Sequence, residues 1–411
     1  MLIAALKLAD IAARSLFVLL ALYSLPVRST GQFGLALTLI GFFTFVSGFE
    51  RYADLQRRMV GTTPIETDRL IVSALRFYAI NYLATVPVLL AALVYWVELP
   101  APLAGMCMVI AVSEHLSNEV YRIALIAPRH RMLLFAVLAK NVVVLAVVAG
   151  LLWLRPATFD IDHLLAAWAA ISLAGTAIAA IGFTRTWAFA SIGSASASGL
   201  RQGLQYRASR THFLIGLVAL SSLQVDRLLA GGLLSLEQSG LYFRHVFVAS
   251  FAYQVFNVAS YNRIAPQVYA NLHAANPVAA HWLVRREMTI LVPLALMLVG
   301  VFYALPPLNS GRVEALQSIN PTFLALLTVG YLVRARADFN GLLLNATYAE
   351  RKVFVSQLTA LTLAIAFNVA LTRLFGLAGT VATLVCSATA YLMISGYFTH
   401  QTPLLAEHAR R

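Results

Sequence analysis

Residues Ser221 to Phe243, SSLQVDRLLAGGLLSLEQSGLYF, place two charged side chains inside a long apolar run. Asp226 and Arg227 are adjacent there, among leucine, alanine and glycine. In a soluble protein this segment would be a helix at the surface, whereas in a membrane both ionisable groups would lie far from bulk water. A charge at the bilayer centre costs at least about 2.5–3.5 kcal/mol, so it must face protein or water. The rest of the sequence decides between these two settings.

The composition indicates a membrane protein. Of 411 residues, 60% are hydrophobic and 11% are charged, and the mean hydropathy is +0.78. A soluble domain carries roughly 25% charged residues. Apolar segments long enough to cross a ~30 Å hydrocarbon core recur along the whole chain. We predict twelve transmembrane helices, over residues 2–25, 31–49, 71–97, 103–127, 132–154, 163–188, 211–234, 241–262, 287–305, 320–346, 353–372 and 377–399.

The basic residues are sorted between the two sides of the predicted membrane. Seventeen of the 30 Lys and Arg residues fall in alternate connections that include residues 50–70 and the C-terminal tail. The opposite connections hold four, which are Arg28, Arg155, Arg312 and Arg373. The positive-inside rule therefore predicts that both termini are cytoplasmic. This sorting accounts for the net charge of +13 without a nucleic-acid partner.

The connections leave little room for a separate catalytic domain. Those on the outer side are a few to about a dozen residues long. The two cysteines, Cys107 and Cys386, lie within apolar segments and form no disulfide or metal-ligand pattern. The first segment has no convincing cleavage site and is predicted to be a retained helix. We therefore expect no enzyme activity, no cofactor and no metal ion.

The second half of the chain repeats the first. The sequence STGQF at Gly31 matches QSGLY at Gly240, at an offset of 209 residues. The segments VPVLLAALVYWVELP and VPLALMLVGVFYALP, which begin near Pro87 and Pro293, match at an offset of 206. A third match joins PRHRMLL to AERKVFV, both basic turns before a helix. Three matches in chain order indicate a duplicated six-helix unit.

The duplication predicts the architecture. Because each unit crosses the membrane an even number of times, the two copies run parallel, related by an axis along the membrane normal. We expect an all-α integral membrane protein with two six-helix lobes around a central cavity. The lobes would comprise residues 1–190 and 211–411, joined by a polar cytoplasmic linker at 191–210. Pro87 and Pro293 are candidate bend points.

Charged residues within the predicted spans favour an anionic ligand. Spacing allows ion pairs within Asp10–Arg14, Glu119–Arg122 and Arg334–Asp338, and Arg76 and Arg244 lie near enough to helix ends to snorkel. The surplus of about four positive charges suits a phosphate or diphosphate better than a cation. The bases are Lys7, Arg14, Arg76, Arg122, Lys140, Arg227, Arg244, Arg334 and Arg336, and the acids are Asp10, Glu114, Glu119, Asp226 and Asp338.

Two helices carry polar side chains at a period of four. The eighth contains Tyr253, Asn257 and Tyr261, and the fourth contains Glu114, Asn118 and Arg122. Aromatic and amide side chains on one face are suited to bind sugar rings and hydroxyl groups. They are also common interhelical hydrogen-bonding groups in membranes, so both interpretations remain open.

Two segments resemble a known family. A first helix with a central Arg14 is followed by LPVRSTGQFGLALTLIGFFTFVSGFERY, and the seventh helix reads QVDRLLAGGLLSLEQSGLYF. Together they resemble the polysaccharide transporter family, the flippases of lipid-linked oligosaccharides and O-antigen units. That family belongs to the multidrug/oligosaccharidyl-lipid/polysaccharide exporter superfamily. In the seventh helix the residues that match the family pattern are Asp226, Leu228, Leu229, Gly240 and Tyr242.

The resemblance implies transport by alternating access in a bacterial cytoplasmic (inner) membrane. The cavity would take the glycan and diphosphate of a polyprenyl-linked oligosaccharide at the inner leaflet and release it at the outer leaflet. The implied partners are this substrate, membrane lipids, and a polysaccharide polymerase or export machinery. Asp226 and Glu114 are candidates for coupling or gating. The candidate substrate contacts are Arg14, Arg122, Lys140, Arg227, Arg334, Arg336, Tyr253, Asn257 and Tyr261.

Other functions are possible with these features. A multidrug exporter of the same superfamily would share the fold, but the basic excess within the spans disfavours cationic drugs. A membrane glycan polymerase or ligase needs a large outer loop or paired carboxylates, and the sequence shows neither. A scaffold protein would give no reason for buried charge. For Asp226 itself, the alternatives are a structural bond to a base on another helix and a role in gating or cation coupling.

Overall fold

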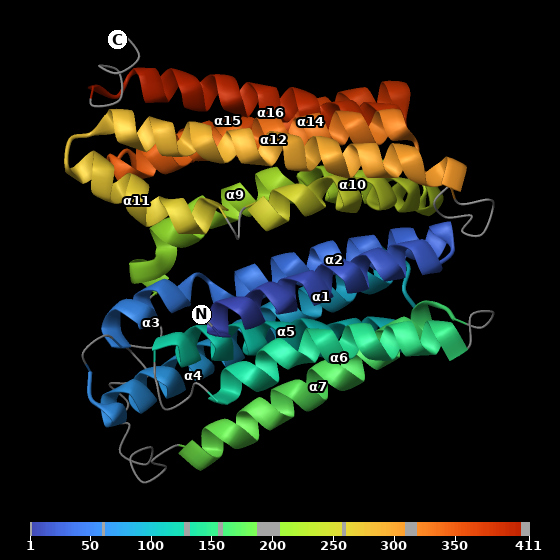
Figure 1. Ribbon diagram of the computed structural model, residues 1–411. Coiled ribbons are helices and arrows are strands. Elements are labelled where there is room, and N and C mark those ends of the chain that lie inside the picture. Colours follow the sequence, from blue (N-terminus) through green and yellow to red (C-terminus); the bar gives the residue numbers. More distant parts are fainter. Residues whose placement is uncertain are drawn as a thin grey trace. The chain divides into compact units, whose positions relative to one another are not determined.

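The computed structural model describes residues 2–59, 62–126, 132–154, 159–186, 206–256, 260–308 and 319–403, and the regular secondary structure in these ranges is helical (Figure 1). Twelve long helices match the twelve predicted spans. They are α1 (Leu2–Ser24), α2 (Val27–Gly48), α4 (Pro64–Tyr95), α5 (Ala101–Ile126), α6 (Met132–Leu154), α7 (Ile161–Thr186), α9 (Tyr206–Leu233), α10 (Leu236–Phe256), α12 (Pro277–Leu308), α14 (Pro321–Ala346), α15 (Glu350–Phe375) and α16 (Leu377–His400).

The helices confirm the predicted class of an all-α membrane protein. By length and composition alone, seven of the helices in the described ranges could each cross a membrane, namely α2, α4, α6, α7, α9, α15 and α16. Many large apolar side chains on these helices are exposed, such as Leu83, Val88 and Trp153 at 78%, 70% and 86%. Contact with lipid explains such a surface, because hydrocarbon chains solvate these side chains as well as a protein core does.

The chain divides into two compact units, Met1–Leu217 and Val218–Arg411. The boundary lies within α9, and residues 187–205, which include most of the predicted linker, lie outside the described residues. The lobe limits at 190 and 211 therefore stay a prediction.

Each unit has the same internal order of two long helices, one short helix and four long helices. In the first unit α2 packs against α4 and α5, and α5 packs against α7. In the second unit α10 packs against α12 and α14, and α14 packs against α16. The matching order and the matching pairs confirm the duplication that the sequence predicted.

Two short helices were not predicted. They are α3 (Arg51–Met59) and α11 (Asn262–His273), and they follow the second long helix of their respective units. Leu55 and Met59 of α3 are buried in a cluster with Phe77 and Tyr78 of α4. α11 buries every fourth residue, Ile264, Val268 and Leu272. Sequence reasoning treated both segments as connections because their mean hydropathy is low, whereas each has one apolar face that packs on its unit.

The predicted eighth helix, 241–262, is wrong at its C-terminal end. α10 ends at Phe256, residues 257–259 lie outside the described residues, and a turn of π type at Ser260 and Tyr261 leads into α11. Tyr253 and Tyr261 therefore belong to different helical segments. The sequence prediction joined them because no charge, glycine or proline interrupts residues 254–260. The structure separates them because α11 is an amphipathic helix of its own.

Several helices begin earlier than predicted, and the difference is largest for α4 and α12. α4 begins at Pro64 instead of residue 71, and α12 begins at Pro277 instead of residue 287. A capping box starts α4, because the Thr63 hydroxyl accepts from the Glu66 N–H and the Glu66 carboxylate accepts from the Thr63 N–H. Hydropathy falls where side chains meet water, but the backbone hydrogen bonds of a helix continue beyond that point.

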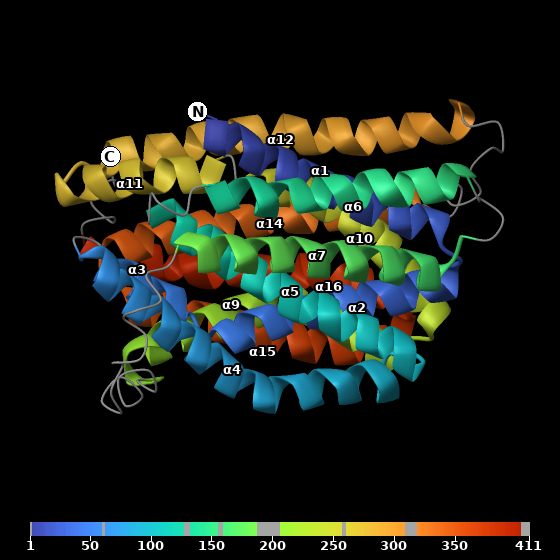
Figure 2. The same cartoon turned by 90° about the horizontal axis from the view of Figure 1, so that it is seen from below.

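The two candidate bend residues, Pro87 and Pro293, lie inside α4 and α12. Figure 2 shows α4 along a curved path and α12 nearly straight. A proline removes one helical hydrogen bond, and α4 curves as expected from that loss. α12 does not show the bend that the sequence predicted.

Candidate functional site

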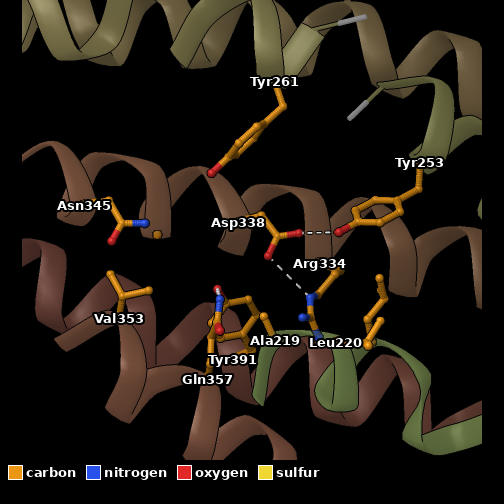
Figure 3. A pocket seen from close by; sticks show the side chains of 12 residues that line it. Ala219, Leu220, Tyr253, Tyr261, Arg334, Asp338, Asn345, Val353, Gln357 and Tyr391 are labelled. Atoms are coloured by element: carbon orange, nitrogen blue, oxygen red, sulfur yellow. Dashed lines mark hydrogen bonds and ion pairs between the residues drawn. The ribbon is translucent and has the colours of Figure 1, made fainter. Parts of the chain in front are cut away.

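A pocket of about 230 Å³ lies within the second unit (Figure 3). Five long helices and the turn before α11 contribute to its wall. From the long helices the lining residues are Ala219, Leu220 and Leu223 of α9, Tyr253 of α10, Val353 and Gln357 of α15, Tyr391 of α16, and Arg334, Asp338, Gly341 and Asn345 of α14. Tyr261, in the turn before α11, completes the wall.

α14 supplies the charged groups of this pocket. Arg334, Asp338, Gly341 and Asn345 are spaced by three or four residues, so they share one face of the helix. The helix begins at an Asn320 cap, whose side-chain oxygen accepts from two backbone N–H groups. Packing against α10, α12, α15 and α16 fixes which way this face points.

Asp338 and Arg334 form an ion pair at the pocket wall. Arg334 Nε lies 3.5 Å from Asp338 Oδ1, and the Tyr253 hydroxyl donates to Asp338 at 2.5 Å. Arg334 also donates to the carbonyl and hydroxyl oxygens of Ser222 at 3.1 and 2.8 Å, and its guanidinium lies 4.8 Å from the Tyr391 ring centroid. These contacts hold the guanidinium in place while leaving its charge only partly neutralised.

Two lining residues present buried polar atoms without a hydrogen-bond partner in the described part of the chain. They are Arg334 Nε, which is too far from Asp338 for a hydrogen bond, and Gln357 Oε1. Most buried polar atoms in proteins make a hydrogen bond. A donor and an acceptor that make none, beside one pocket, therefore indicate a place for a ligand or water.

Asp226 and Arg227 make hydrogen bonds to different helices of the second unit. Asp226 is 4% exposed and accepts a hydrogen bond from the Tyr242 hydroxyl. Arg227 is 7% exposed, donates to the Tyr331 hydroxyl at 3.2 Å and lies 4.8 Å from the Phe247 ring centroid. The hydrogen-bond partner of Asp226 on another helix is thus a tyrosine, whereas one of the two alternatives for this residue was a bond to a base. Neither residue lines the pocket.

Glu114 lies at the centre of a buried charge cluster in the first unit. Lys140 Nζ donates to Glu114 Oε1 at 2.6 Å, and Arg14 NH1 lies 3.7 Å from Glu114 Oε2. Glu114 and Lys140 are 3% and 4% exposed, whereas the Arg14 side chain is 42% exposed. Two bases around one acid leave this cluster positive.

A second cluster surrounds Glu119. Its carboxylate accepts from Arg122 at 2.6 Å and from the Tyr78 hydroxyl at 2.5 Å. The Arg122 guanidinium lies 3.6 Å from the centroid of the Tyr52 ring, on α3. Burial raises the pKa of Tyr52, and the nearby Glu50 carboxylate raises it further, so the ring stays neutral beneath the cation. The predicted Glu119–Arg122 pair is confirmed.

Other predicted residues lie elsewhere. Arg336 donates to Asn340 at 2.9 Å and does not line the pocket. Arg244 is 3% exposed, so the expectation that it snorkels to water is wrong, whereas Arg76 is exposed. Asp10 accepts from Asn141 at 2.6 Å. Asn257 and the side chain of Lys7 lie outside the described residues.

The structure thus brings together Tyr253, Tyr261 and Arg334 in one pocket, and Arg14, Glu114 and Lys140 in one cluster. Sequence reasoning missed several polar residues in apolar segments, among them Gln357, Tyr391 and His115. His115 is 1% exposed and its Nδ1 lies 2.5 Å from the Tyr82 hydroxyl. A search for every polar side chain in the spans, neutral ones included, would have found all three.

The fold is similar to that of solved structures of transporters, among them one from the MOP superfamily. An inward-facing multidrug resistance MATE family transporter of that superfamily aligns with a TM-score of 0.72 and 13% identity, over 98% of this chain and 95% of that chain. The lipid II flippase MurJ, in an inward closed conformation, aligns with a TM-score of 0.65 and 10% identity, over 97% of this chain and 87% of that chain. No protein-family model and no curated protein matches the sequence. At such low identity the likeness concerns the fold.

Proposed function

We propose that this protein is a flippase of the bacterial cytoplasmic membrane, with both termini in the cytoplasm. It moves a polyprenyl-diphosphate-linked oligosaccharide, such as a surface polysaccharide or O-antigen repeat unit, from the inner to the outer leaflet by alternating access. The similar solved structures include both a lipid II flippase and multidrug transporters, so the fold is compatible with either kind of cargo.

The pocket around Arg334 supports a glycan ligand. A guanidinium, a carboxylate, three tyrosines and two amide side chains line it, and Arg334 Nε and Gln357 Oε1 make no hydrogen bond within the described residues. Sugar hydroxyl groups donate and accept hydrogen bonds together, and the flat faces of sugar rings pack on aromatic rings. A donor, an acceptor and aromatic faces around about 230 Å³ provide both kinds of contact.

The positive cluster in the first unit supports an anionic head group. Arg14 is the half-exposed member of the Arg14–Glu114–Lys140 cluster, so its guanidinium is the one available to a diphosphate. An arginine fork matches phosphate oxygens, and two bases around one acid leave positive charge for it. This charge disfavours a cationic drug as cargo.

The test is complementation in a strain that lacks this protein. We expect lipid-linked oligosaccharide to accumulate on the cytoplasmic leaflet of the knockout. Arg334→Ala and Arg14→Ala should restore surface polysaccharide poorly while protein levels stay close to normal. Arg351→Ala, which changes an exposed arginine at the start of α15, is the matched control and should restore it fully.

Full restoration by both Arg14→Ala and Arg334→Ala would contradict the anionic substrate site. A knockout with unchanged lipid-linked glycan and increased accumulation of cationic drugs would instead support a multidrug exporter.

A further inference from the structure

Tyr261 reaches the pocket wall from outside the long helices. The other lining residues belong to α9, α10, α14, α15 and α16, whereas Tyr261 lies in the turn that leads into α11. Figure 3 shows its side chain pointing into the pocket. Its ring stacks on that of Phe339 of α14, with the two ring centroids 6.0 Å apart. The place of this tyrosine in the pocket therefore depends on what holds the start of α11.

The backbone before α11 does not fix Tyr261 by itself. Tyr261 is the N-cap residue of α11, and its side chain makes no capping hydrogen bond. Many helices begin at a side chain that binds the first free N–H groups, and this one does not. Ile264, Val268 and Leu272 bury one face of α11. Apolar packing is non-directional, so a directional contact is needed to fix the position of the first turn.

Arg263 and Glu287 provide that contact. Arg263 lies in the first turn of α11, two residues after Tyr261, and its Nη2 donates to both carboxylate oxygens of Glu287 at 2.9 Å. Glu287 belongs to α12, and its side chain is completely buried. Arg286, also of α12, donates to the same carboxylate at 3.0 Å. The buried carboxylate thus joins the first turn of α11 to α12, with a second positive charge to stabilise it.

We propose that Glu287 is a positioning residue for the pocket. Through Arg263 it holds the first turn of α11, and with that turn it holds the Tyr261 ring in the pocket wall. Hydrogen bonds between ionised groups are about twice as strong as those between neutral groups, which suits them to this role. The placement of Tyr261 is a property of the fold, whereas its effect on glycan binding rests on the proposed function.

Removal of the Glu287 charge should leave the protein folded. The side chains of Arg263 and Arg286 are 56% and 41% exposed, so water solvates both when Glu287→Gln takes their acid away. The large cost of breaking a buried ion pair arises from a charge left buried without a partner, and none is left here. The unfolding temperature in detergent should therefore change little, and a local effect at α11 can be measured separately.

The test is the rate at which N-ethylmaleimide modifies Tyr261→Cys in the purified full-length protein, in a background with Cys107→Ala and Cys386→Ala. We expect Glu287→Gln to raise this rate roughly tenfold, because the loss of a charge-assisted hydrogen bond favours opening of the turn by about that factor. Asn345→Cys places a second reporter in the same pocket, on α14, and should keep its rate.

Three further variants separate this contact from general effects of substitution. Arg263→Met should raise the rate as much as Glu287→Gln does, and the two together should raise it no further, because both remove one contact. Glu287→Asp keeps the charge and should keep most of the protection. Asp162→Asn removes an exposed acid from the first unit and should have no effect.

Equal rates at Tyr261→Cys with and without Glu287→Gln would overturn the positioning role. An equal rise at Asn345→Cys would overturn it as well, because the second unit as a whole would then have loosened. A faster reaction at Tyr261→Cys, together with normal surface polysaccharide in a knockout complemented by Glu287→Gln, would support the positioning role and contradict the pocket as the glycan site.

Discussion

Asp226 and Arg227 lie side by side in sequence but bind different helices. Asp226 accepts from Tyr242 of α10, and Arg227 donates to Tyr331 of α14. Adjacent residues on a helix point about 100° apart, so the two side chains have different hydrogen-bond partners. Both side chains are almost completely buried and neither lines the pocket. These contacts favour a structural role for the pair.

We predict that Asp226→Asn destabilises the protein strongly. Asparagine keeps the hydrogen bond to Tyr242 but removes the negative charge beside the buried Arg227, at a cost of about 3–5 kcal/mol. The unfolding temperature in detergent should fall, and the double variant Asp226→Asn with Arg227→Met should recover part of the loss because no isolated charge remains.

A wild-type unfolding temperature in Asp226→Asn would show that Asp226 is not an anchor. If that variant also flipped its substrate with the normal response to an imposed ion gradient, a role in coupling would be excluded too.

The hairpin of α15 and α16 depends on two glycines. Gly376 alone joins the helices and has φ of +57°, a conformation that other residues rarely adopt. A methyl group at Gly379 would lie 1.9 Å from the carbonyl oxygen of Leu371. The close approach of the two backbones is what allows a turn of one residue.

We predict that Gly379→Ala separates the ends of α15 and α16 and destabilises the second unit. Overpacking usually costs about 1–3 kcal/mol, and here the obstacle is backbone and cannot rotate away. Gly300→Ala, in α12, is the matched control because nothing lies within 4 Å of the added carbon. Thermal unfolding in detergent would compare the two. Equal unfolding temperatures for both variants would contradict the close approach.

In the whole molecule the same order of six long helices occurs twice, with a short amphipathic helix at the same place in each unit. The sorting of basic residues predicts the orientation, with 17 on the predicted cytoplasmic side and four on the opposite side. Arg351 lies at the start of α15 and Arg373 near its end, so the predicted orientation puts the two arginines on opposite sides of the membrane.

We predict that Arg351→Cys reacts only with a thiol reagent at the cytoplasmic face, and Arg373→Cys only with one at the outer face. Membrane-impermeant maleimide on intact cells and on inverted vesicles would measure this. The background should carry Cys107→Ala and Cys386→Ala, because Cys386 is exposed. Labelling of Arg373→Cys from the inside would reverse the proposed topology.

The sequence by itself determined the twelve long helices, the duplication and the class of fold. The helices and the class of fold follow from apolar length against the thickness of a bilayer, which can be evaluated within one segment. The duplication follows from sequence matches between the two halves. Local spacing along one helix also predicted the Glu119–Arg122 and Arg334–Asp338 pairs correctly.

Only the tertiary structure decided which helices meet. Glu114 pairs with Lys140 across 26 residues, Tyr253 with Asp338 across 85, and Arg334 with Ser222 across 112. These partners depend on which faces of which helices pack together, and lipid-facing and buried faces of a membrane helix are equally apolar. Hydropathy therefore cannot distinguish those faces, and polar contacts between helices become visible only in the folded chain.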